Sequence, residues 1–187
     1  MEGAALLQTF RDTGALLEGH FLLRSGLHSR QFFQCAHLLK HPRLCSEICA
    51  SLAEQCRHLE VDAVISPAMG GILVGHELAR HLDLPHIFAE KQDGKLVVRR
   101  FDPTAYRRYL VAEDVVTTGS AVREVCALVR QAGAELAGVA CMVDRSGNHP
   151  PDFGAPFLSL LRLNVETFSA ENVPLDLKDI PAIKPGS

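Results

Sequence analysis

The stretch Tyr109-Leu-Val-Ala-Glu-Asp-Val-Val-Thr-Thr-Gly-Ser-Ala121 decides the fold, because it leads from an apolar run through a short polar loop into an amphipathic segment. The apolar run is typical of a strand that is buried on both faces of a parallel sheet. Glu113 and Asp114 follow at its carboxyl end, and 117–120 leads into a helix expected near Ala121. Ligands of open α/β sheets bind at the carboxyl ends of the strands. The stretch therefore predicts a binding site at that edge of the sheet.

The rest of the chain alternates between short apolar runs and amphipathic segments, which is typical of βαβ units. A helix is expected at 4–18, then a hairpin at 19–33 that turns at Ser25-Gly26. The further expected elements are helices at 42–58, 71–82 and 120–133, and strands at 61–66, 85–90, 95–100, 109–116, 136–143 and 157–163. The pattern predicts an α/β fold with an open, mainly parallel sheet flanked by helices.

Composition narrows the class of protein. The 187 residues are 47% hydrophobic and 22% charged, which suits one domain, 1–187, with its own core. A net charge of −3 argues against a duplex-binding surface, so no nucleic-acid partner is expected. No apolar run approaches the roughly 20 residues that cross a bilayer, and the N-terminus lacks the basic lead of a signal peptide. We therefore expect a cytoplasmic protein without membrane contact.

The loop 117–120 has the residue types that hold a phosphate group. Glycine and hydroxyl side chains at a helix N-terminus offer N–H and O–H donors, and the helix dipole favours negative charge. Glu113 and Asp114 would repel a bare phosphate at close range, but they can accept hydrogen bonds from sugar hydroxyls. Alone, such acids are more often solvated turn residues and such a loop an ordinary helix cap. Together with the buried strand, they favour a ribose 5-phosphate site.

The stretch 109–121 resembles the phosphoribosyl pyrophosphate (PRPP) signature of the type I phosphoribosyltransferases, with its apolar strand, two acids, two aliphatic residues and Thr/Gly/Ser loop. The resemblance implies that family's fold, a small N-terminal hood to which 1–40 contributes, and a homodimer. It implies that Glu113 and Asp114 are catalytic, and that Mg²⁺ is bound mainly through PRPP. The residues that would bind PRPP are Val115, Val116, Thr117, Thr118, Gly119, Ser120 and Ala121.

Three further segments resemble orotate phosphoribosyltransferases. The hairpin from Gly19 is similar to the one that covers orotate, which implies substrate contacts for Arg24, Phe32 and Phe33. The segment Ser66-Pro-Ala-Met-Gly-Gly71 is similar to the pyrophosphate loop, which implies contacts for Met69, Gly70 and Gly71. Val143-Asp-Arg-Ser146 is the third, and it implies that Arg145 meets the orotate carboxylate.

The residues themselves leave two of these roles open. A guanidinium can grip a carboxylate with two parallel hydrogen bonds, but Arg145 could equally be a surface residue that pairs with Asp144 or Asp152. At least one of Phe32 and Phe33 is expected to pack in the core.

The chain also departs from the family's pattern. Many members have a lysine in the pyrophosphate loop, where this chain has Met69-Gly70-Gly71, and a lysine where it has Arg24. The stretch 91–100 is shorter than the family's mobile catalytic loop and has no histidine. Its basic residues remain candidates for handling pyrophosphate, with Lys91 catalytic and Lys95 and Arg99 binding substrate, and Arg100 adding charge. The alternative is a solvated basic hairpin.

The reaction that the resemblance implies is transfer of the phosphoribosyl group of PRPP to N1 of orotate, a step of pyrimidine nucleotide biosynthesis. Its products are orotidine 5′-monophosphate and pyrophosphate. Two alternatives stay open. One is a phosphoribosyltransferase for another base such as a purine, and the other is a non-catalytic regulator that binds PRPP.

Overall fold

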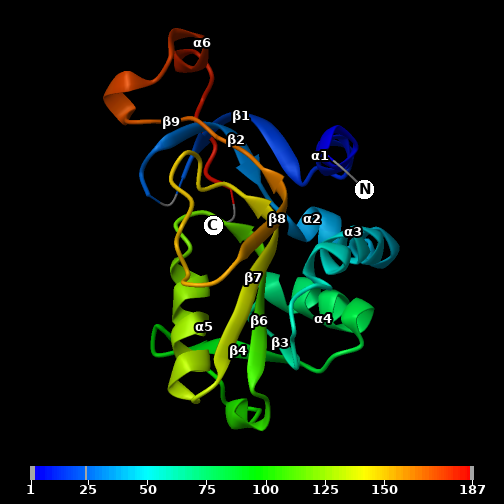
Figure 1. Cartoon of the computed structure of the whole chain (residues 1–187). Coiled ribbons are helices and arrows are strands. Elements are labelled where there is room, and N and C mark those ends of the chain that lie inside the picture. The colour runs from blue at the N-terminus through cyan, green and yellow to red at the C-terminus, as the bar shows by residue number, and fades with distance from the viewer. Residues whose placement is uncertain (1–2, 24, 186–187) are drawn as a thin grey trace.

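The larger of two sheets carries the loops that the sequence singles out (Figure 1). The computed structural model describes residues 3–23 and 25–185. Strand order in the larger sheet is β5-β4-β3-β6-β7-β8. The parallel strands are β3 (Ala63–Pro67), β4 (His86–Gln92), β6 (Arg108–Val116), β7 (Glu135–Asp144) and β8 (Phe157–Arg162), and β5 (Lys95–Val97) runs antiparallel to β4. The predicted α/β class with an open, mainly parallel sheet is confirmed.

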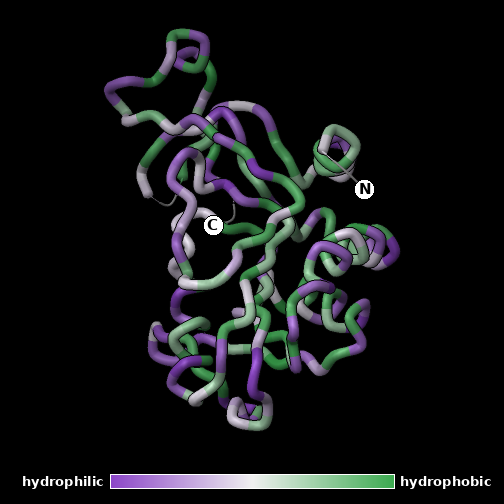
Figure 2. Tube along the Cα trace, viewed as in Figure 1, coloured by the Kyte–Doolittle hydropathy of each residue, from purple (hydrophilic) through white to green (hydrophobic). Residues whose placement is uncertain are grey.

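Helices cover both faces of this sheet, as Figure 1 shows. Alternate residues of β6 point to opposite faces, so Leu110 and Ala112 pack in one core and Tyr109 and Val111 in the other. The helices α3 (Pro42–Cys56) and α4 (Gly70–Leu82) contribute to the first core, and α5 (Ser120–Gln131) contributes to the second. Figure 2 shows the apolar residues along the central strands and many hydrophilic ones in the outer loops. The central strand is thus apolar because both of its faces are covered.

The smaller sheet is built around the expected hairpin. It consists of β1 (Leu16–Leu22), β2 (His28–Phe33) and β9 (Thr167–Phe168), in the order β1-β2-β9. The helix expected at 4–18 is wrong in its second half, since α1 (Gly3–Asp12) ends early and β1 begins at Leu16. Gly14 has a φ of 71°, which a helix does not allow, and Leu16 is buried while Leu17 is exposed, as in a strand.

Short elements complete the described chain. They are the helices α2 (Ala36–Leu39) and α6 (Leu175–Lys178), and the 3₁₀ turns η1 (Pro103–Ala105) and η2 (Ala170–Asn172). None of the helices in 3–23 and 25–185 is long and apolar enough to cross a membrane.

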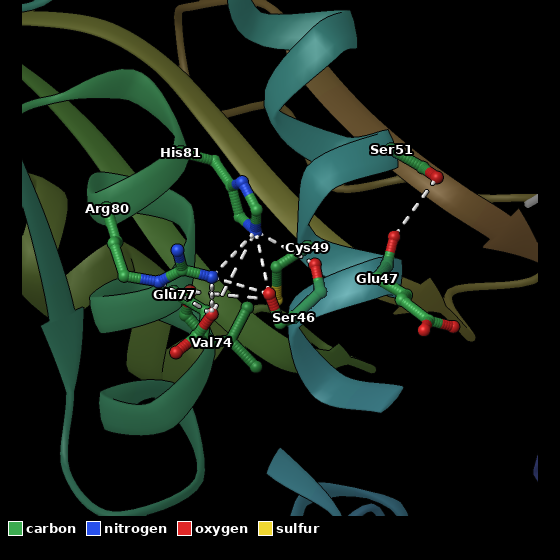
Figure 3. Close-up of polar contacts among 8 residues, drawn as sticks. All are labelled: Ser46, Glu47, Cys49, Ser51, Val74, Glu77, Arg80 and His81. Atoms are coloured by element: carbon green, nitrogen blue, oxygen red, sulfur yellow. Dashed lines mark hydrogen bonds and ion pairs between the residues drawn. The ribbon is translucent and has the colours of Figure 1, made fainter. Parts of the chain in front are cut away.

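A polar network holds α4 against α3 (Figure 3). His81 Nε2 lies 3.1 Å from Ser46 Oγ and 2.9 Å from the Ser46 carbonyl oxygen. Arg80 donates to Glu77 at 2.8 Å and also to Ser46. The thiol of Cys49 on α3 lies 4.0 Å from the carbonyl oxygen of Val74 on α4. These contacts fix the position of α4, whose first turn borders the site described next.

Candidate functional site

Two adjacent carboxyl groups lie near the end of β6. Glu113 is 8% exposed and Asp114 is half-buried. Burial, and then the charge of Asp114, raise the pKa of Glu113 well above its ordinary range. Burial raises the pKa of Asp114 as well, although the N–H of Val115, 2.7 Å from Asp114 Oδ1, opposes that rise. In the described structure no cation pairs with either acid. The pair is suited to stabilise positive charge that a ligand brings or develops.

The glycine loop at the start of α4 packs directly on these acids. A Cβ atom on Gly70 would stand 2.7 Å from Asp114 Oδ2, and one on Gly71 would stand 2.9 Å from Glu113 Oε1. Both distances are shorter than a Cβ atom allows, so a larger residue at either position would displace the facing carboxyl group. The preceding Ala68–Met69 peptide bond is cis, and the Met69 side chain is 83% exposed. The structure therefore places Gly70 and Gly71 beside the acid pair, with Met69 immediately before them.

The polar loop after β6 forms the N-terminal end of α5, as the sequence indicates. Thr117, Thr118 and Ser120 are exposed, and Gly119 precedes the helix with a φ of 74°. A Cβ atom on Gly119 would stand 2.9 Å from the Phe153 ring, so the residue must be glycine for two reasons. Of the other residues expected in this loop, Val116 is buried and Val115 and Ala121 are half-buried. The loop presents hydroxyl groups and the positive end of a helix to an anion.

A cavity of about 560 Å³ connects this loop with the hairpin and the residue that follows β7. Thr117 and Thr118 line it from the loop before α5, Phe32 lines it from β2, and Arg145 lines it from the end of β7. Its other lining residues are Leu22, Leu23, Ser25, Leu27, Gln34, Val165, Thr167, Lys184 and Pro185. None of these lining residues is an Asp or Glu, so the cavity is suited to an anionic ligand with an apolar body.

Arg145 is half-buried and has no acidic partner in the described part of the chain. Its Nε atom is buried and has no hydrogen-bond partner in the described part of the chain, and burial lowers its pKa. Asp144 and Asp152, the two acids considered as partners of Arg145, bond elsewhere. Asp144 accepts from Arg162 at 2.9 Å, and Asp152 accepts from the N–H of Gly154 at 2.8 Å. A half-buried guanidinium that lines a cavity and has no acidic partner among the described residues is suited to bind a carboxylate.

The two phenylalanines of the hairpin have different surroundings. Phe33 is buried, packs edge-on against Phe10 with ring centroids 5.8 Å apart, and lies under the Arg145 guanidinium at 5.1 Å. Phe32 is half-buried and lines the cavity. Phe33 thus supports Arg145 from the core, whereas Phe32 faces the ligand space. Arg24, the remaining expected residue of the hairpin, lies outside the described residues.

The basic residues at 91–100 lie at the far edge of the sheet. Lys91 pairs with Leu96 in the β4–β5 hairpin, and β4 is separated from β6 by β3. Two strand spacings put the backbones of β4 and β6 about 10 Å apart. Arg99 and Arg100 both pair with Glu90, at 3.5 and 2.9 Å. The structure therefore does not bring these residues into contact with the acid pair.

Sequence reasoning missed the contribution of the C-terminal segment. Lys184 and Pro185 line the cavity although they are about 40 residues beyond Arg145. Val165, just before β9, and Thr167, the first residue of β9, line it as well. No local motif marks these four residues, and only the folded chain brings them to the cavity.

Comparison with known proteins gives three consistent findings. Residues 36–169 match a family described as the phosphoribosyl transferase domain. The orotate phosphoribosyltransferase of Caldicellulosiruptor bescii is 46% identical over 188 residues, which cover 100% of this chain and 98% of that protein. The orotate phosphoribosyltransferase of Carboxydothermus hydrogenoformans is 46% identical over 185 residues, 97% of this chain and 96% of that protein.

Solved structures are similar in fold. The orotate phosphoribosyltransferase of Aeropyrum pernix has a TM-score of 0.68 at 24% identity, over 84% of this chain and 93% of that chain. The adenine phosphoribosyltransferase of Rhodothermus marinus has a TM-score of 0.64 at 24% identity, over 86% of this chain and 100% of that chain. Enzymes named for different bases thus share this fold, and the base must be argued from the site itself.

Proposed function

Because this chain belongs to the phosphoribosyltransferase family, and within it to the orotate phosphoribosyltransferases, we propose that it transfers the phosphoribosyl group of PRPP to N1 of orotate. The products are orotidine 5′-monophosphate and pyrophosphate, in pyrimidine nucleotide biosynthesis. One observation carries the choice of base. The cavity that begins at the phosphate-type loop, at Thr117 and Thr118, also contains the unpaired Arg145. A base with a carboxylate can pair with that guanidinium, and a neutral purine leaves the half-buried charge without an anion.

The 5′-phosphate is held at the N-terminal end of α5. The hydroxyl groups of Thr117, Thr118 and Ser120 are exposed there, and the first N–H groups of the helix have no partner within the helix itself. These donors and the helix dipole favour a dianionic phosphate. The ribose then extends toward Glu113 and Asp114, which come just before the loop.

The acid pair holds the ribose and stabilises the reacting centre. A ribosyl group that loses pyrophosphate passes through a state with oxocarbenium character, as in glycoside chemistry. Positive charge on that ring relieves the unfavourable burial of Glu113 and Asp114, whose pKa values are raised in its absence. The interaction is therefore stronger in the transition state than in the ground state, which is the condition for catalysis.

The leaving pyrophosphate is placed by the glycine loop. The close approach of Gly70 and Gly71 to the acids puts backbone beside the ribose site with no side chain between them. We propose Mg²⁺ as the cofactor, bound mainly through PRPP, where it neutralises charge on the leaving group. This fits the donors present, because 3–23 and 25–185 contain no cluster of three metal-ligating side chains and Mg²⁺ often binds through substrate phosphates. Within the basic stretch 91–100, Lys91 and Lys95 have no ion pair in the described structure, so they are the candidates for binding pyrophosphate.

An assay of PRPP consumption with orotate, adenine and hypoxanthine, with and without Mg²⁺, tests the proposal. Of the three bases, we expect only orotate to support PRPP consumption, and only when Mg²⁺ is present. Turnover with a purine would support the enzyme for another base, and PRPP binding without any turnover would support the regulator. Arg145→Ala is then expected to raise the KM for orotate far more than the KM for PRPP, and equal effects on both would refute the carboxylate contact.

We further propose that the protein is a homodimer in the cytoplasm, as the family resemblance implies. Lys91 and Lys95 lie far from the acid pair of their own chain. This supports a dimer, because in a dimer these lysines could act at the site of the neighbouring subunit. Sedimentation velocity measures the oligomeric state, and mixing Lys91→Ala with Asp114→Asn protein tests the exchange. If each site is shared between subunits, activity in the mixture should exceed that of either impaired variant alone.

A further inference from the structure

The C-terminal segment 180–185 crosses the smaller sheet and returns to the cavity. It pairs with β1 through two backbone hydrogen bonds, from the N–H of Leu22 to the Ile183 carbonyl oxygen at 2.8 Å and from the N–H of Ile183 to the His20 carbonyl oxygen at 2.9 Å. Figure 1 shows this segment, in red, running back from α6 toward the middle of the molecule. The residue that follows this pairing is Lys184, which lines the cavity.

Several contacts upstream fix the path of this segment. Leu177 is buried, and Asp176 accepts a hydrogen bond from Arg30 on β2 at 2.9 Å. His20 Nδ1 lies 2.7 Å from the carbonyl oxygen of Ile180. The segment is thus attached to the hairpin on both sides of Pro181. Its last described residues are held at the cavity by these attachments and do not depend on a ligand for their position.

Lys184 and Arg145 are the two cations among the described residues that line the cavity. The lining contains no carboxylate to neutralise them, and Lys184 has no ion pair in the described part of the chain. Arg145 reaches the cavity from the end of β7, and Lys184 reaches it from the segment on β1. Two positive charges from separate elements therefore share one largely apolar space.

We propose that Lys184 is a specificity-determining residue that binds the carboxylate of the base together with Arg145. The inference rests on the proposed function and adds to it a residue outside the hairpin and the sheet. A carboxylate has about four lone-pair sites, so a bidentate guanidinium leaves acceptor capacity for an ammonium group. Arg145 is fixed by Phe33 and supplies geometry, whereas the flexible lysine supplies charge. The pair favours a base that carries a carboxylate over a neutral base of the same shape.

Three variants test this role by steady-state kinetics. Lys184→Ala is expected to raise the KM for orotate roughly tenfold, as for loss of a charge-assisted hydrogen bond, while the KM for PRPP changes less than about twofold. Lys184→Arg, which keeps the charge, is expected to restore most of the orotate affinity. Lys178→Ala is the matched control, because Lys178 belongs to the same C-terminal region but does not line the cavity.

Uracil, which lacks the carboxylate, separates a charge contact from a change in cavity shape. We expect uracil to inhibit the wild-type protein and the Lys184→Ala variant with the same inhibition constant. The thermal unfolding midpoint of the variant should also match that of the wild type, which excludes a general loss of structure. A rise in the KM for PRPP instead would show that Lys184 binds a phosphate, and would overturn the proposal.

The wild-type measurements distinguish a failure of the Lys184 inference from a failure of the proposed function. If the wild type turns over orotate and Lys184→Ala leaves its KM unchanged, the inference fails and the proposed function stands. If the wild type neither binds nor turns over orotate, the proposed function fails and the inference falls with it. A loss of uracil binding in Lys184→Ala equal to the loss of orotate binding would also overturn the inference, because it would show a role in shape alone.

Discussion

Replacing Glu113 with glutamine exchanges one of two adjacent carboxyl groups for an uncharged amide of nearly the same shape. In the ligand-free protein, Glu113 is 8% exposed and has Asp114 as its neighbour, so its negative charge is disfavoured both by burial and by repulsion. A glutamine oxygen can keep the 3.1 Å hydrogen bond from the N–H of Asp114, and its amide nitrogen can donate to the Asp114 carboxylate. We therefore expect a more stable but less active protein.

The size of the stabilisation follows from the position of the two charges. Two full charges on adjacent side chains repel by a few kcal/mol, on the order of 3 kcal/mol, at an effective dielectric constant of about 20. The wild-type pair avoids part of this cost by binding a proton, so we expect Glu113→Gln to gain about 1–2 kcal/mol. For a chain of this length that is a rise of about 2–8 °C in the unfolding midpoint. Turnover should fall because the amide cannot stabilise positive charge on the ribose.

The pH dependence gives a second measure of the same effect. A carboxyl group whose pKa is raised in the folded state contributes stability at low pH, and this contribution is lost as the pH rises through the folded pKa. The raised pKa values of Glu113 and Asp114 therefore predict that ligand-free wild-type stability falls as the pH rises above the ordinary Glu value of about 4.3. Glu113→Gln should flatten this fall.

Differential scanning calorimetry across pH, with and without PRPP and Mg²⁺, measures both effects. The wild type should gain more stability from the ligand than the variant does, because the ribose hydroxyls can donate to two carboxyl groups in the wild type and to only one in the variant. A variant that unfolds at a lower temperature than the wild type, or that keeps full turnover, would refute the conclusion that the Glu113–Asp114 pair both lowers stability and supports catalysis.

Three further predictions concern the glycine loop, the second acid of the pair and the basic hairpin at the edge of the sheet. Gly71→Ala is expected to destabilise the protein by about 1–3 kcal/mol, since its Cβ atom would stand 3.1 Å from the Ala112 carbonyl oxygen, which belongs to the sheet and cannot move away; chemical denaturation measures the loss, and an unchanged midpoint would contradict the close packing. Asp114→Asn is expected to lower kcat sharply with the fold intact by circular dichroism, and unchanged turnover would remove Asp114 from the mechanism. Lys91→Ala and Lys95→Ala are expected to lower kcat or raise the KM for PRPP without changing the KM for orotate, and wild-type kinetics in both would mark the hairpin as solvated surface.

The parts of the fold that the sequence predicts well are those in which local pattern and tertiary burial agree. The run around Leu110 is apolar because both faces of β6 are covered, and Thr117–Ser120 lies where the helix begins. The same reasoning failed at Leu16 and Leu17, which a helical pattern includes but which belong to β1. There the pairing with β2 outweighs local propensity, and Gly14 was the available signal for the break.

The features of the site that the sequence does not predict depend on contacts between segments that are far apart in the chain. Arg145 could be a surface residue by sequence, and its unpaired Nε becomes apparent only when Phe33 and the strands around it are in place. The pairing of Ile183 with Phe21 of β1 joins the C-terminal segment to the N-terminal hairpin. No periodicity in that short proline-rich segment indicates the pairing. The cavity is made by such contacts, so the choice of base was harder to predict than the phosphate loop.

The site holds unbalanced charge of opposite sign in two places, and this arrangement explains how one fold can select one base. Among the described residues, the acid pair has no cationic partner and Arg145 has no anionic partner. A ligand with positive character at the ribose and a carboxylate on the base removes both costs at once. A neutral base relieves only the first and leaves the half-buried guanidinium without an anion. A site built to bind a polar group rejects ligands that lack it far more strongly than an apolar pocket rejects a poor fit. Selectivity for orotate therefore comes from the cost of leaving Arg145 unpaired more than from the shape of the cavity, and removing that charge should weaken orotate binding without creating affinity for a purine.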